Sequence, residues 1–153
     1  GPATYRDLAW WSGLSAKDAK RGIEMNRPRR VEVDGLTCWT LGSRGAKPVP
    51  RDAAHLLPIY DEYLNAYRDR RAATHGPSIN AANKGGYGTF QHALVIGGQV
   101  AGTWRVTQKP KSVAVAGIPS RRLRRNEERS VRRAVMRYED FVNTPAEVRF
   151  ARA

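Results

Sequence analysis

Two adjacent carboxylates among tyrosines are the residues whose types and spacing most directly suggest chemistry. Asp61 and Glu62 are flanked by Tyr60 and Tyr63, and Tyr67 follows four residues later. A carboxyl pair can transfer protons as general acid and base, and aromatic rings can line a binding pocket. The same side chains can also be ordinary buried partners of arginine and tyrosine. The sequence leaves these three interpretations open.

Other reactive residues are sparse. The single cysteine, Cys38, excludes an internal disulfide and a multi-cysteine zinc site, and we expect it to be buried in the core. The three histidines lack the paired spacing of zinc ligands, and no serine lies in a nucleophile-elbow pattern. The glycine-rich segment 84–88 lacks the Lys-Ser/Thr of a phosphate-binding P-loop. We therefore expect neither a metal nor a cofactor.

The net charge points to a polyanionic partner. The chain holds 27 Lys and Arg against 14 Asp and Glu, a formal charge of +13, and its pI is near 10.7. The excess is largest at the ends, with 9 basic and 5 acidic residues in 1–50 and 13 and 5 in 101–153. Proteins this basic usually bind nucleic acid or an anionic membrane, because phosphate contacts release counterions and supply much of the affinity. No secretory signal or membrane-length apolar run is present, so we expect a cytoplasmic location and no membrane partner.

The first fifty residues predict two short helices joined by a glycine. Thr4 can cap the first helix, and Gly13 can end it in a left-handed conformation. Ser15 can start a second helix over residues 16–25, whose outer face is basic. This pattern is typical of a helix-turn-helix, although an ordinary helical hairpin fits it equally well.

A β-hairpin after the second helix favours the first alternative. Asp34-Gly35 separates the strand-like segments 31–33 and 36–41, a strong hairpin signal. A hairpin placed directly after a helix-turn-helix forms a winged helix. We expect six basic residues of the second helix and the hairpin base to contact nucleic acid: Lys17, Lys20, Arg21, Arg27, Arg29 and Arg30.

The element that must position Asp61 and Glu62 is a predicted helix over residues 58–71. Pro58 suits its first turn, where its missing N–H costs nothing. Helical spacing would place Tyr60, Leu64 and Tyr67 on one face.

Strands are predicted in the last part of the chain. Three apolar, β-branched segments are separated by turn residues: 89–96, 99–107 and 113–118. Gly102 indicates a bulge or a close backbone approach. Together with the Val31–Leu41 hairpin, these strands would form a small β-barrel or a bent antiparallel sheet.

An arginine-rich helix is predicted over residues 121–142, capped by Ser120 or Asn126. Its arginines can face a nucleic-acid groove, or Glu127 and Glu128 can neutralise them through i, i+4 pairs. Both interpretations remain open.

The expected fold class is α+β, a winged helix-turn-helix followed by a small β-barrel or bent antiparallel sheet with a C-terminal helix. The expected domains are a winged helix over 3–50, a helix plus barrel-like region over 51–143, and a tail over 144–153. Residues 42–50 and 75–88 are expected to be loops, the first against phosphate and the second either folding over bound DNA or unconstrained.

Three separated segments of the sequence resemble a known family. They are DLAWWSGLS at 7–15, LLPIYDEYLNAYRDR at 56–70 and LVIGGQVAGTWR at 94–105. From about residue 4 to 143, the chain resembles bacterial winged-helix DNA-binding proteins that include the crosslink-repair, or azinomycin-resistance, DNA glycosylases. The resemblance implies tandem winged helices ahead of a C-terminal β-barrel, and this chain would be the later part. Its partners would be double-stranded DNA and the N-terminal half of the same protein.

Catalysis in that family is attributed to a Gln-x-Gln or Gln-x-Asp motif of the N-terminal half. None of the glutamines here, Gln91, Gln99 and Gln108, begins such a triplet. We therefore expect no catalytic residue in this chain. By resemblance, four residues would support a lesion pocket: Asp61, Tyr63, Tyr67 and Arg68.

Two functions follow from these observations. The first is the DNA-binding C-terminal part of a glycosylase-like protein that acts on alkylated or crosslinked DNA and is associated with the nucleoid. The alternative is a non-catalytic DNA-binding regulator or self-resistance protein.

Overall fold

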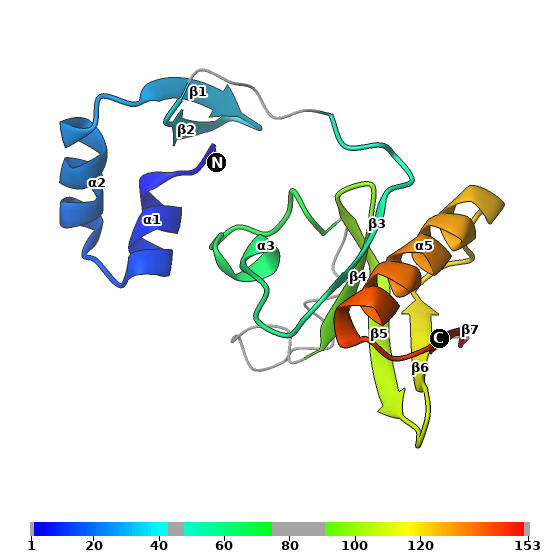
Figure 1. Ribbon diagram of the computed structural model, residues 1–153. Helices are drawn as coiled ribbons and strands as arrows, with labels where there is room; N and C mark the ends of the chain where they lie inside the picture. The colour runs from blue at the N-terminus through cyan, green and yellow to red at the C-terminus, as the bar shows by residue number, and fades with distance from the viewer. Residues whose placement is uncertain (1, 43–47, 75–90, 152–153) are drawn as a thin grey trace. The chain divides into compact units, whose positions relative to one another are not determined.

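The computed structural model describes residues 2–42, 48–74 and 91–151. The chain divides into two compact units (Figure 1). Unit 1 comprises Gly1–Lys47 and Glu62–Arg70, and unit 2 comprises Pro48–Asp61 and Arg71–Ala153. The predicted loop 75–88, the glycine-rich segment 84–88 within it and most of the predicted loop 42–50 lie outside the described residues.

Unit 1 begins with two helices whose ends are set by local sequence. Helix α1 spans Tyr5–Ser12, with a capping box between Thr4 and Asp7, and ends at Gly13 with φ +73°. Helix α2 spans Ala16–Met25, and the Ser15 hydroxyl accepts a hydrogen bond from the Asp18 backbone N–H. Both predicted helices are confirmed, because each depends on caps within one turn of its own ends.

A two-stranded antiparallel hairpin follows α2. Strand β1 is Arg29–Val33 and strand β2 is Leu36–Thr40, joined by a turn in which Asp34 and Gly35 both have positive φ. Ala3 pairs with Trp39 on the other edge of β2 through two backbone hydrogen bonds. Cys38 is buried as expected, and this burial raises the pKa of its thiol. The hairpin is confirmed, but it forms its own sheet and adds no strand to unit 2.

The predicted helix over 58–71 is wrong. Only α3, Glu62–Asn65, is helical there, so Tyr60, Leu64 and Tyr67 do not share a helical face. The residues just before Pro58 are strand instead: β3, Ala54–Leu57, pairs with a later strand, and the Leu57 carbonyl accepts a hydrogen bond from the Trp104 indole N–H at 2.8 Å. Tyr60 has φ +65°, which interrupts any helix starting at Pro58.

Unit 2 is built on one five-stranded sheet in the order β3-β4-β5-β6-β7. The strands after β3 are β4 His92–Ile96, β5 Gln99–Gln108, β6 Val113–Pro119 and β7 Ala146–Phe150. Neighbours pair antiparallel except β6 and β7, which are parallel. The α+β class is confirmed. The sheet is open, with β3 and β7 at its edges, so the predicted barrel is wrong.

The predicted tail also contains an ordered strand. In β7, the half-buried Ala146, Val148 and Phe150 alternate with the exposed Glu147 and Arg149. This two-residue period is the signature of a half-buried strand, and it was readable in the sequence.

Helix α5, Arg125–Val142, lies along one face of the sheet and contacts both β3 and β7 (Figure 1). It buries Val131 and Val135 against strand residues such as Leu94 and Val115, all at most 2% exposed. The helix shields the apolar face that barrel closure would otherwise cover. This packing is the physical reason that the sheet stays open.

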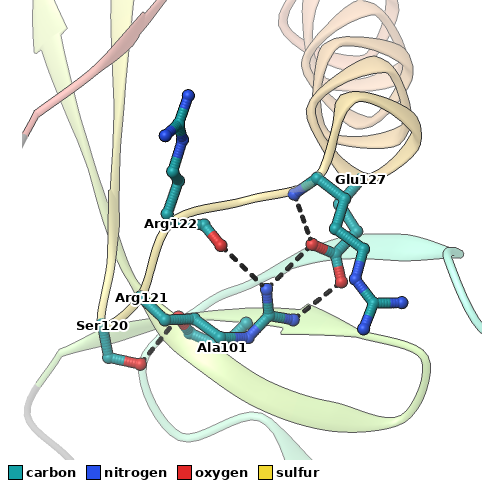
Figure 2. A network of polar contacts seen from close by, with 6 residues as sticks. Ala101, Ser120, Arg121, Arg122 and Glu127 are labelled. Atoms are coloured by element: carbon teal, nitrogen blue, oxygen red, sulfur yellow. Dashed lines mark hydrogen bonds and ion pairs between the residues drawn. The ribbon is translucent and has the colours of Figure 1, made fainter.

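The start of α5 differs from the prediction, because residues 121–124 are not helical and neither Ser120 nor Asn126 is the cap. Figure 2 shows what replaces them. The buried Glu127 carboxylate accepts two hydrogen bonds from the Arg121 guanidinium, at 2.8 and 2.7 Å, and one from the Arg124 backbone N–H at 2.8 Å. The Arg121 hydrogen bonds are the main reason that the pKa of Glu127 falls to about 2.

This network predicts acid sensitivity of unit 2. Because folding lowers the pKa of Glu127 from 4.5 to about 2, its stabilisation is complete above pH 4.5 and disappears as the pH falls through 2. Glu127→Gln should cost about 2 kcal/mol at neutral pH and flatten the stability profile between pH 5 and 2. Thermal unfolding across that range measures both effects. Glu128→Gln, outside the network, should keep the wild-type profile, and an equal response of both variants would contradict the assignment.

Candidate functional site

The exposed face of α2 is the first part of the candidate site. Lys17, Lys20 and Arg21 are exposed, whereas Ala19 on the opposite side is fully buried. One face of a short helix is therefore held in the core while the other presents cations to solvent. The structure places these three predicted residues together.

The second part is the base of the β1–β2 hairpin. Arg27 has φ +46° where the chain leaves α2, and Arg29 and Arg30 begin β1; all three are exposed. Arg30 donates to the Glu32 carboxylate at 3.0 Å, and the Thr37 hydroxyl donates to the same oxygen at 2.9 Å. The Thr37 hydrogen bond, followed by that from Arg30, lowers the pKa of Glu32. Within the described residues, Arg30 is the one of the six predicted cations that pairs with a carboxylate.

Unit 1 also contains a cleft that the sequence did not predict. It has a volume of about 450 Å³ and is lined by Tyr5, Arg6, Ala9, Trp10, Ala16 and Arg68. The Arg6 guanidinium donates to the Tyr5 hydroxyl at 3.1 Å, and this hydrogen bond lowers the pKa of Tyr5. Ala16 begins α2, so the cleft adjoins the basic helix. In the sequence, the adjacent Tyr5 and Arg6 at the start of a helix were the one sign of this cleft. Only the fold brings Arg68 to them.

Segment 62–70 is tied to α1 by three long-range hydrogen bonds. The buried Asp7 carboxylate accepts the Arg68 backbone N–H at 2.9 Å. The Trp10 indole N–H donates to the Asn65 carbonyl at 3.0 Å, and that of Trp11 to the Glu62 carboxylate at 2.9 Å. Glu62 thus acts here as a hydrogen-bond acceptor of Trp11.

The four predicted lesion-pocket residues are divided between the units. Asp61 belongs to unit 2, whereas Tyr63, Tyr67 and Arg68 belong to unit 1. Burial raises the pKa of both tyrosines, which keeps them as neutral hydrogen-bond donors. A pocket formed by all four residues stays a prediction.

Two further properties concern the described part of the chain. No helix there is both long and apolar enough to cross a bilayer. No group of three or more His, Cys, Asp or Glu side chains is arranged there to hold a metal ion.

Known proteins share sequence and fold features with this chain. A family model described as "DNA glycosylase AlkZ-like" matches residues 1–141. The chain belongs to this family. The resemblance inferred from the three sequence segments is therefore confirmed.

A solved structure, Streptomyces sahachiroi DNA glycosylase AlkZ, is similar in fold to this AlkZ-like chain. The two share 20% sequence identity with a TM-score of 0.70, and the match covers 99% of this chain and 42% of that chain. This chain therefore spans less than half of the solved protein. No curated protein matches it significantly.

Proposed function

We propose that this chain is the DNA-binding, C-terminal portion of a DNA glycosylase-like protein, and that unit 1 binds double-stranded DNA as a winged helix-turn-helix. The exposed cationic face of α2, with the hairpin arginines beside it in sequence, carries the proposal. In this arrangement α2 enters the major groove, and Arg27, Arg29 and Arg30 hold the hairpin against phosphates. Arg6 and Arg68 add cations at the neighbouring cleft.

The proposed substrate is alkylated or crosslinked DNA, and the residues that break the glycosidic bond lie outside this chain. The absence of a Gln-x-Gln or Gln-x-Asp triplet supports this division. Tyr63, Tyr67 and Arg68, with Asp61, would support the lesion once DNA is bound. The same absence favours the second candidate, a DNA-binding regulator or self-resistance protein without catalysis. Either function would place the protein at the nucleoid.

The α2 face gives a direct test. Replacing Lys17, Lys20 and Arg21 together by Ala should raise the Kd for duplex DNA about tenfold at 0.1 M salt. It should also lower the slope of log Kd against log salt concentration by about 2 to 3. Each lost phosphate contact removes about 0.9 of that slope. Fluorescence anisotropy with labelled duplex measures both quantities.

The control is a charge-matched variant in which Arg105, Lys111 and Arg149, three exposed cations of unit 2, become Ala. It loses the same net charge and should change the Kd less than threefold. Equal behaviour of the two triple variants would contradict the α2 interface. A duplex with N7-alkylguanine completes the test, since release of the base by this chain alone would contradict the assignment of catalysis elsewhere.

A further inference from the structure

One face of α5 carries a row of arginines that the proposed winged-helix interface does not use. The arginine row consists of Arg125, Arg129, Arg132 and Arg133, all exposed, at spacings that place them on the same side of the helix. The opposite side is buried through Val131, Ala134 and Val135. The helix therefore presents the row outward from unit 2.

Within the described residues the acidic residues of α5 form no ion pair with this row, although Glu128 lies one helical turn from both Arg125 and Arg132. Glu127 is turned to Arg121 and the helix start, and Glu139 accepts the Ala146 backbone N–H at 2.8 Å. Among the described residues, no carboxylate forms an ion pair with any guanidinium of the row. Of the two glutamates that the sequence allowed to pair with these arginines, Glu127 is used at the helix start, and Glu128 forms no ion pair within the described residues.

Two arginines of the row are held in place without losing their charge. Arg133 donates to the Ser130 hydroxyl at 2.6 Å, and the Arg132 guanidinium lies 5.4 Å from the centre of the Phe150 ring. Neutral partners restrict the side chains while leaving the positive charge unpaired. Restricting them in advance reduces the entropy lost when an anion binds.

We propose that the arginine row is a second DNA contact, which binds the phosphate backbone of the duplex and reads no bases. From residue 125 to 133 the row extends about 12 Å along the helix, at about 1.5 Å per residue. Duplex DNA carries one charge per about 1.7 Å of axis, so this length faces several phosphates. The planar guanidinium forms paired hydrogen bonds to phosphate oxygens.

The inference rests on the proposed function, since it adds a contact from unit 2 to one from unit 1. Two linked contacts on the same duplex raise overall affinity through effective concentration, without any new base recognition. The contribution of the row should therefore be the same on duplexes of unrelated sequence.

The test compares two variants that each lose three positive charges from unit 2. The first replaces Arg125, Arg129 and Arg133 by Ala, and the second is the Arg105, Lys111 and Arg149 control. On two unrelated duplexes, the α5 variant should raise the Kd about tenfold at 0.1 M salt and lower the salt slope by about 2 to 3. Circular dichroism and thermal unfolding should show both variants folded like the wild type, because all the replaced side chains are exposed.

The outcomes separate this inference from the proposed function. If the α5 variant binds like the control while the α2 variant is weakened, the arginine row is not a DNA contact and the winged-helix proposal stands. If only the α5 variant is weakened, the row is a contact and the α2 interface is wrong. If the wild-type chain fails to bind DNA even at low salt, both are overturned. A loss on only one of the two duplexes would overturn backbone recognition.

Discussion

Gly102→Ala should destabilise unit 2 by more than about 3 kcal/mol and lower its unfolding temperature by about 10–20 °C. Gly102 has φ +153° and lies at the irregular register between β4 and β5. A Cβ there would overlap the Ile118 carbonyl oxygen and lie 2.6 Å from the Pro119 Cα. Both are backbone atoms of the adjacent strand, so the clash cannot be relieved by a side-chain rotation. The sheet must separate locally or the turn after β6 must move.

The matched control is Gly117→Ala in β6. The atoms nearest to an added Cβ at this position are those of the Phe150 ring edge, 3.4 Å away, and the Arg149 carbonyl oxygen at 3.9 Å. Its cost should stay below about 1 kcal/mol. Hydrogen exchange of peptides from 91–120 measures both variants within unit 2. Similar protection in the two variants would show that the β5–β6 contact is looser than described.

Asp7→Ala should destabilise unit 1 by about 3 kcal/mol. Its buried carboxylate accepts hydrogen bonds from both the Thr4 backbone N–H and hydroxyl, at 2.8 and 2.7 Å, and from the Arg68 backbone N–H. The substitution leaves these donors without their acceptor, at a cost of about 1–3 kcal/mol per buried group. It also removes one of the three hydrogen bonds that hold segment 62–70 against α1. Hydrogen exchange should increase in peptides of both 2–12 and 62–70.

The control for Asp7→Ala is the equivalent substitution in the next helix, Asp18→Ala. Asp18 occupies the same third position of α2, but it is exposed and its one described side-chain partner is Ser15. Asp18→Ala should therefore cost only about 0.5–1 kcal/mol and leave segment 62–70 protected. If the two variants exchanged alike at 62–70, the Asp7–Arg68 hydrogen bond would not contribute to holding that segment.

The candidate site was predictable where neighbours in sequence decide it. The two helices of unit 1 and the Asp34-Gly35 turn depend on caps and on backbone angles within a few residues, and all three were predicted from the sequence. The three cations of α2 follow from helical spacing in the same way. The cleft of Tyr5, Arg6 and Arg68 was not predictable, because it requires a hydrogen bond between residues 61 positions apart.

The adjacent carboxylates and tyrosines show the opposite case. Their helical alignment failed because Tyr60 has φ +65°, which breaks a helix that starts at Pro58, while the preceding Leu56 and Leu57 pair with β4. Asp61 and Glu62 are neighbours in sequence, yet they belong to different units. Neither the interrupted helix nor the division of these two residues between units can be predicted from local sequence propensity.

The sequence by itself determined the family, the strongly basic character and the local elements of unit 1, because charge, caps and turns are properties of short stretches. Only the tertiary structure decided that the sheet is open, that residues 146–150 form its edge strand, and that the arginine row of α5 has no carboxylate ion pair within the described residues. These results depend on which backbone and carboxyl groups, distant in sequence, form hydrogen bonds with one another. Glu127 and Glu128 are the clearest example: the sequence allowed both to neutralise arginines of the helix, but Glu127 is held by Arg121 and the Arg124 backbone N–H, and Glu128 forms no ion pair within the described residues.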